Sequence, residues 1–117
     1  MSENTITLSA TFNIENKFSH EETARIIGEA LNLSFESDDS GRWEEYPAYV
    51  SLTLGIELAL LAPPDPEFDL REVKEEVYQL TSRDHTPFIK NATAVDLSLY
   101  LATIIENKTG LQCEQIY

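Results

Sequence analysis

The stretch YPAYVSLTLGIELALLAPP, from Tyr46 to Pro64, is the only segment of the chain that is both apolar enough and long enough to form the middle of the protein. Its even-numbered residues from Val50 to Ala62 lie on one face of an extended chain, and apolar Ala59 and Leu61 lie on the other. A strand that is apolar on one face throughout and on both near its end belongs in the centre of a sheet.

Glycine and proline decide between a strand and a buried helix here. Gly55 disfavours a helix by about 1 kcal/mol relative to Ala, and prolines bracket the stretch at 47, 63 and 64. We therefore predict one central strand with a bulge or bend at Gly55, on which the remaining elements pack.

The chain before this stretch predicts a strand and a helix. Thr5 to Ile14 alternates apolar residues with Thr, Ser and Asn, which is typical of a strand with one buried face. Ser19 and Glu22 form a capping box, so a helix is expected from about His20 to Asn32. Leu33 to Glu36 is a short strand candidate, and Ser37 to Arg42 has the composition of a hairpin tip.

The chain after it predicts a further strand and a second helix. Val77 to Ser82 favours a strand with Tyr78 and Leu80 inward. Thr93, with an acid three residues later, marks the start of a helix over about 94 to 108. Its expected buried stripe consists of Leu97, Tyr100, Leu101, Ile104 and Ile105. Leu111 to Ile116 is a candidate edge strand.

This order of elements, β-α-β-β-β-α with a candidate last strand, predicts an α+β fold. We expect a two-layer sandwich in which two helices pack on one face of a mostly antiparallel sheet. A chain of 117 residues fits a single domain, 1–117.

Composition restricts the partners and the compartment. The net charge is −13, from 21 acidic and 8 basic residues, which argues against binding to nucleic acid or an anionic membrane. One Cys, no apolar segment of about 20 residues, and a polar start after Met1 predict a soluble protein in the reducing cytoplasm.

The acids cluster on either side of the central stretch. Between Glu29 and Glu76 there are thirteen acidic residues and three basic ones. This distribution fits either a solubilising surface or a surface complementary to a basic partner.

We predict a partner-binding surface formed by the hairpin tip and the proline-rich loop. The candidate contact residues are acids and aromatic side chains: Asp38, Asp39, Trp43, Glu44, Glu45, Tyr46, Asp65, Glu67 and Asp69. An equally good interpretation of Trp43 is that it covers the end of the sheet.

No spacing in the chain indicates catalysis, a metal site or a bound cofactor. His20, His85 and Cys113 lie in different predicted elements, so no nucleophile is paired locally with a base. The acids around Gly41 lack the alternating ligands and terminal Glu of a calcium loop. The four glycines stand singly, so no phosphate-binding loop is present. We therefore expect a protein that is not an enzyme.

The segment LNLSFESDDSGRWEEYPAYVSLTLGIELALLAPPDPEFDLRE resembles small bacterial immunity proteins of contact-dependent growth inhibition and polymorphic toxin systems. In that family an aromatic-Pro-Ala-Tyr-Val segment leads into a Leu-Gly apolar strand and a Pro-Pro-Asp acidic loop. The resemblance spans about Leu31 to Leu80 and implies a cytoplasmic protein that binds and neutralises one cognate toxin domain, typically a nuclease with a basic active site. The alternatives are a nucleic-acid mimic or other acidic inhibitor of a phage or host enzyme, and a small enzyme or ligand-binding domain.

Overall fold

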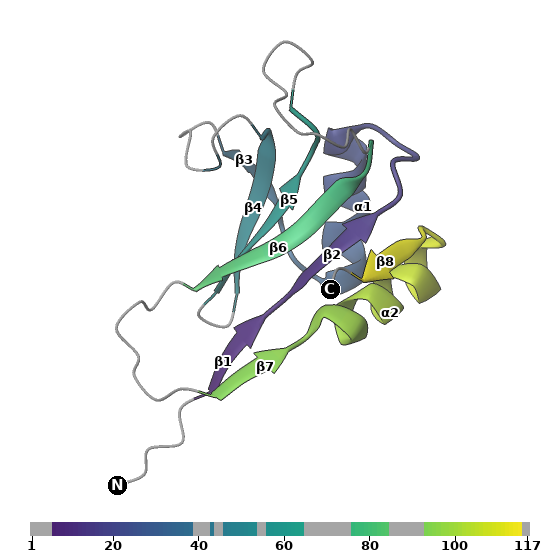
Figure 1. Ribbon diagram of the computed structural model, residues 1–117. Coiled ribbons are helices and arrows are strands. Elements are labelled where there is room, and N and C mark those ends of the chain that lie inside the picture. The colour runs from purple at the N-terminus through teal and green to yellow at the C-terminus, as the bar shows by residue number, and fades with distance from the viewer. Residues whose placement is uncertain are drawn as a thin grey trace, which may run out of the picture.

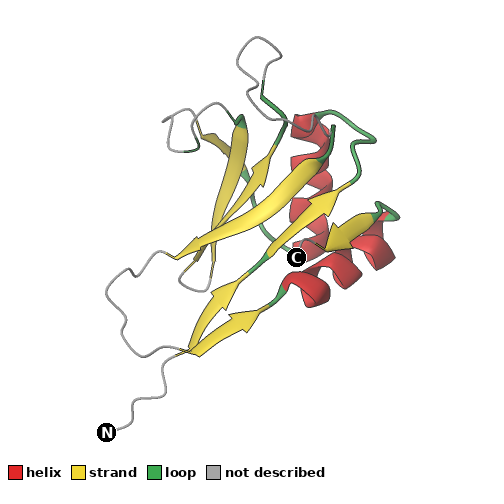
Figure 2. Cartoon of the chain, in the orientation of Figure 1, coloured by secondary structure: helices red, strands yellow, loops and turns green. Residues whose placement is uncertain are grey.

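The computed structural model describes residues 6–38, 43, 46–53, 56–64, 76–84 and 93–115. Its two helices and mostly antiparallel sheet form the predicted α+β fold (Figures 1 and 2). Strands β1 (Ile6–Ser9) and β2 (Thr11–Ile14) come first, followed by helix α1 (His20–Leu31). Strands β3 (Glu36–Asp38), β4 (Ala48–Thr53), β5 (Ile56–Leu61), β6 (Tyr78–Asp84) and β7 (Thr93–Asp96) precede helix α2 (Ser98–Thr109) and β8 (Cys113–Gln115).

The main sheet has six strands in the order β3-β4-β5-β6-β2-β8, and every neighbouring pair is antiparallel. β1 and β7 form a separate parallel pair. α1 lies behind the main sheet in Figure 1, and side chains of both helices join one core cluster with the sheet. The largest fully buried side chains of this core are Phe12, Ile14, Ile27, Leu60, Leu80, Ile105 and Leu111.

The prediction of one central strand over the apolar stretch is wrong, because the stretch forms two strands. β4 and β5 pair antiparallel, with Thr53 opposite Ile56. In this register Ser51 shares a face with Leu58, and Val50 shares the other face with Ala59. The reversal therefore exchanges the faces of odd and even residues. Leu58 and Leu60 lie in the core as expected, whereas Leu52 is 61% exposed.

The first predicted strand is divided at Ala10. β2 continues into the main sheet between β6 and β8, while β1 leaves that sheet and pairs with β7. Two hydroxyls stabilise the division, because the Ala10 amide donates to Ser82 Oγ at 3.0 Å and the Thr11 amide donates to Ser98 Oγ at 2.8 Å.

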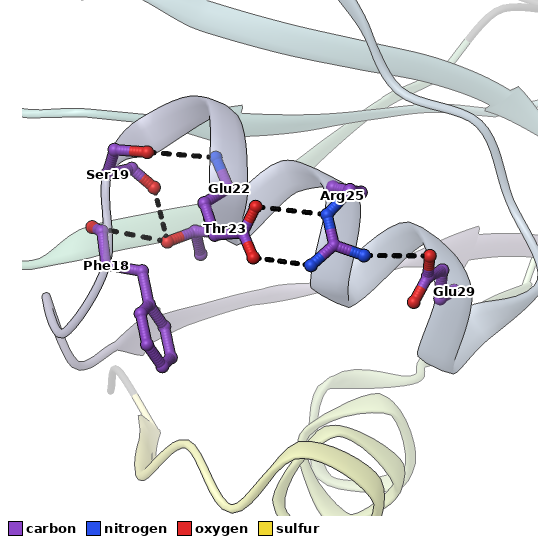
Figure 3. Close-up of polar contacts among 6 residues, drawn as sticks. All are labelled: Phe18, Ser19, Glu22, Thr23, Arg25 and Glu29. Atoms are coloured by element: carbon purple, nitrogen blue, oxygen red, sulfur yellow. Dashed lines mark hydrogen bonds and ion pairs between the residues drawn. The ribbon is translucent and has the colours of Figure 1, made fainter.

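Helix α1 begins where its cap predicts. The Ser19 hydroxyl accepts a hydrogen bond from the Glu22 amide at 3.1 Å, and the Thr23 hydroxyl donates to the Ser19 carbonyl (Figure 3). The reciprocal half of the capping box is absent, because the Glu22 carboxylate pairs with Arg25 instead. Arg25 also pairs with Glu29 at 2.9 Å, so one guanidinium bridges both neighbouring turns.

The predicted start of the second helix is wrong by about one turn. Thr93 does not cap a helix, because residues 93–96 form β7, and α2 begins at Ser98. A β-branched pair at Thr93 and Val95, with β1 available as a partner, favours the strand. The later start also shifts the buried face: Ala102 and Ile105 are buried, but Tyr100 is 64% exposed.

The remaining strand predictions are confirmed with shifted ends. β6 carries buried Tyr78 and Leu80, and β8 forms the sheet edge that was a candidate over 111–116. The short strand after α1 lies at 36–38 and not at 33–36.

Candidate functional site: the acidic rim

One end of the main sheet carries the described residues that flank the two predicted binding segments. Asp38 pairs with Ala48, Ala48 with Leu61, and Leu61 with Gln79, so these four residues form one row across β3, β4, β5 and β6. We call the end of the sheet at this row the acidic rim. The connections 39–47 and 62–77 both start and finish there, and together they contain nine acidic and three basic residues.

A backbone contact joins the two connections at the rim. The Ala62 amide donates to the Pro47 carbonyl at 3.0 Å. Residue 47 precedes β4 and residue 62 follows β5, so the antiparallel pairing continues one step past both strands. The end of the first acid-rich connection and the start of the second are therefore fixed relative to each other.

The structure describes three of the nine predicted contact residues. Asp38 is half-buried at the end of β3, and Trp43 and Tyr46 are half-buried in the connection between β3 and β4. The other six, Asp39, Glu44, Glu45, Asp65, Glu67 and Asp69, lie outside the described residues.

Trp43 packs on the face of the sheet that is turned away from the core cluster. It contacts a small cluster of buried residues, Ala48, Ala59 and Leu61, together with Tyr46. The guanidinium of Arg83, in β6, lies 4.4 Å from the centre of the Trp43 ring, which is a cation–π geometry. The indole therefore reaches from the β3–β4 connection to the third strand along, in agreement with the interpretation that Trp43 covers the sheet.

The local backbone also holds this aromatic segment in place. The Tyr46 amide donates to the Trp43 carbonyl at 3.1 Å, which closes a turn between the two aromatic residues. Within the described part of the chain, the buried Nε1 of Trp43 has no hydrogen-bond partner. Trp43 is thus held by packing and by Arg83, and its substitution would disturb the connection that it anchors.

The sequence analysis did not predict that Glu57 and Arg83 lie opposite each other on the sheet face that Trp43 covers. Glu57 is only 3% exposed, and the sheet register places it directly opposite Arg83 and Leu52. The signal in the sequence was Glu57 itself, which interrupts an otherwise apolar run and is costly to bury without compensation.

The free cysteine and the candidate metal ligands among the described residues show no arrangement typical of a reactive site. Burial, with the nearby charges of Glu106 and Glu15, raises the pKa of the Cys113 thiol to about 12, so it is protonated at neutral pH. No three His, Cys, Asp or Glu side chains gather to hold a metal ion in the described ranges. His85 lies outside them.

His20 fixes the start of α1 against the sheet just behind the acidic rim. Its Nε2 donates to the Leu60 carbonyl at 2.8 Å, and its ring stacks on Tyr78 and meets Tyr49 edge-on. Tyr78 in turn donates its hydroxyl proton to the Phe18 carbonyl at 2.6 Å. Burial lowers the pKa of His20, because the low-polarity surroundings disfavour the imidazolium.

This lowered pKa predicts a loss of stability in mild acid. The unfolded chain takes up a proton at His20 near pH 6.5, whereas the folded chain does so only at lower pH. The free energy of unfolding should therefore be flat above that pH and decrease as the pH falls below it. Urea titrations between pH 7.5 and 5.5 should show a steeper decrease for the wild type than for His20→Gln, whose amide can still donate to Leu60. An equal decrease in the free energy of unfolding for both proteins would show that His20 does not cause the loss of stability in acid.

No family model, curated protein or solved structure matches this chain. No helix among the described residues has both the length and the apolar character needed to cross a membrane.

Proposed function

We propose that this protein is a cytoplasmic immunity protein that binds a cognate toxin domain, a nuclease with a basic active site, and neutralises it by covering that site. The observation that carries the proposal is the acidic rim, where two acid-rich connections separated by β4 and β5 in sequence are anchored side by side. The resemblance of residues 31–80 to immunity proteins of contact-dependent inhibition systems supports the same function.

The physical basis is competition for phosphate-binding groups. A nuclease holds its polyanionic substrate with Lys and Arg side chains, and clustered carboxylates on a folded partner are attracted to the same positions. Long-range attraction between an acidic rim and a basic site also accelerates encounter, towards about 10⁸ to 10⁹ M⁻¹s⁻¹ at low salt. Fast association suits an inhibitor that must act before its target cleaves nucleic acid.

Two kinds of residue contribute differently to such an interface. The carboxylates at the edge of the rim would act mainly on the association rate and its salt dependence. Trp43 and Tyr46 are half-buried and hold the β3–β4 connection against the sheet. Their exposed edges supply aromatic surface of the type that dominates binding energy in protein interfaces.

We expect charge reversal at the rim to weaken binding of the toxin domain. The test is co-expression with the C-terminal domain encoded by the upstream reading frame, scored by copurification and by rescue of growth. Asp38→Lys/Glu45→Lys and Asp65→Lys/Asp69→Lys should each slow association about tenfold or more at low salt and flatten its salt dependence.

A matched control changes the same number of charges away from the rim. Glu29→Lys/Asp96→Lys, checked for folding, alters exposed acids near the end of α1 and at the end of β7, and it should leave the association rate within about twofold. Trp43→Ala, checked for folding by circular dichroism, should instead speed dissociation. Equal effects of the rim and control variants would reduce the acidic rim to a solubilising surface.

A further inference from the structure

The described part of the chain also contains an apolar pocket at the end of the sheet away from the acidic rim. It has a volume of about 350 Å³ and opens between the carboxyl-terminal end of α1, the exposed side of α2 and the start of β5. Thr53 and Ile56, which form the last pair of the β4–β5 hairpin, both line it, whereas Ala48 and Leu61 mark the opposite end of the same hairpin. The pocket and the acidic rim are therefore separate features.

The pocket lies beside the carboxyl-terminal end of α1, where residues of α2 are incompletely covered. α1 ends at Leu31, and its C-cap residue Asn32 adopts a left-handed conformation with a φ of 60°. On α2, Leu101 and Ile104 are only partly covered, and Tyr100 is 64% exposed. Leu31 and Leu58 complete an apolar wall of the kind that binds small ligands in proteins.

One cation lies at this apolar pocket. Among the described residues, Lys108 in the last turn of α2 is the only charged one in the pocket lining. Among the other described cations, Arg25 pairs with two carboxylates, Lys17 lies near the Phe18 ring and Arg83 near the Trp43 ring. No ion pair or ring contact of Lys108 occurs within the described residues.

The carboxyl end of α1 does not compete for this cation. The Glu29 and Gly28 carbonyls already accept hydrogen bonds from the Asn32 and Leu33 amides, at 3.3 and 2.7 Å. The ammonium of Lys108 is thus available to a group that enters the pocket from solvent, and the polar side chains of Asn32 and Thr53 offer hydrogen bonds at the same site.

We propose that this pocket binds a small amphiphilic anion, with an aliphatic body against the apolar wall and a carboxylate head at Lys108. The volume suits a short to medium acyl chain, and each further methylene buried should tighten binding about fourfold, so chain length sets the affinity. The carboxylate head, paired with Lys108, sets the preference for an acid over a neutral analogue. This site is independent of the toxin-binding function proposed for the acidic rim.

The probes for the test are octanoate and octan-1-ol, which share a tail and differ in the charge of the head. Calorimetric titration of the full chain should show one octanoate site, with weaker binding of octan-1-ol. Lys108→Met should weaken octanoate about fivefold and leave octan-1-ol unchanged, because only the head contact is lost. Lys17→Met, which removes a cation near the other end of α1, is the matched control and should change neither.

A second variant tests the position of the tail. Ile104→Trp adds bulk to the pocket wall and should abolish binding of both probes, and Ala30→Leu fills the pocket from α1 if the first variant does not fold. The proposal is overturned if millimolar octanoate does not bind, if the filled variant binds it as well as the wild type, or if Lys108→Met behaves like Lys17→Met.

Discussion

Replacing Leu60 by alanine should lower the free energy of unfolding by about 2 to 5 kcal/mol, the largest effect expected from a single substitution in this protein. Leu60 is fully buried in β5, opposite Tyr49 on one side and Leu80 on the other. Removal of its side chain leaves a cavity that neighbouring strands cannot close without breaking their pairing. Urea unfolding followed by circular dichroism should show a lower midpoint with an unchanged slope.

The matched control for this experiment is in the partner strand. Leu52 belongs to β4 of the same hairpin but is 61% exposed, so Leu52→Ala should change stability by no more than about 0.5 kcal/mol. A large loss at Leu52, or a small one at Leu60, would contradict the exchange of faces between β4 and β5.

The second large effect is expected at Gly28, inside α1. In most helices an alanine would be about 1 kcal/mol better than glycine. Here a Cβ at position 28 would lie 2.6 Å from the Leu33 carbonyl oxygen, a backbone atom that also belongs to the turn closing the helix. We therefore expect Gly28→Ala to destabilise the protein by about 1 to 3 kcal/mol.

The informative result is whether Gly28→Ala lowers or raises the free energy of unfolding, which thermal or urea unfolding measures. Glu29→Ala, at the adjacent exposed position, removes only a surface ion pair with Arg25 and should cost less than about 0.5 kcal/mol. Stabilisation by Gly28→Ala would mean that the segment after α1 can move away from the helix at no cost.

Patterns in residues close together in sequence correctly predicted helix α1 and strand β6. Ser19 caps α1 as expected, and the alternation of Tyr78 and Leu80 identified β6, because these features depend on residues close in sequence. The hairpin at 48–61 was missed because a two-residue reversal preserves the alternation of apolar residues along the chain while exchanging the faces. Thr93 is as suitable for a helix cap as for a strand. Its pairing with β1, which is distant in sequence, selects the strand.

The candidate site was predictable in composition but not in arrangement. The acids and aromatics between 38 and 69 are evident from the sequence, and only the pairing of Ala48 with Leu61 brings their two connections to one end of the sheet. A single central strand would have placed them at opposite ends. The apolar pocket at Lys108 had no signal of its own, because two helices far apart in sequence line it together.

The pairing of β2 with β8 has a consequence for how the chain folds. Phe12 lies opposite Gln115, and Ile14 lies opposite Cys113. In the same way, β1 can pair only after β7 has been synthesised. Such sequence-distant pairing closes very long loops and slows folding. During synthesis the β4–β5 hairpin can form early, but β2 keeps an unpaired edge until residues 113–115 have emerged. A chain stalled before residues 113–115 have emerged exposes the unpaired edge of β2, which is prone to aggregate with other copies of the chain.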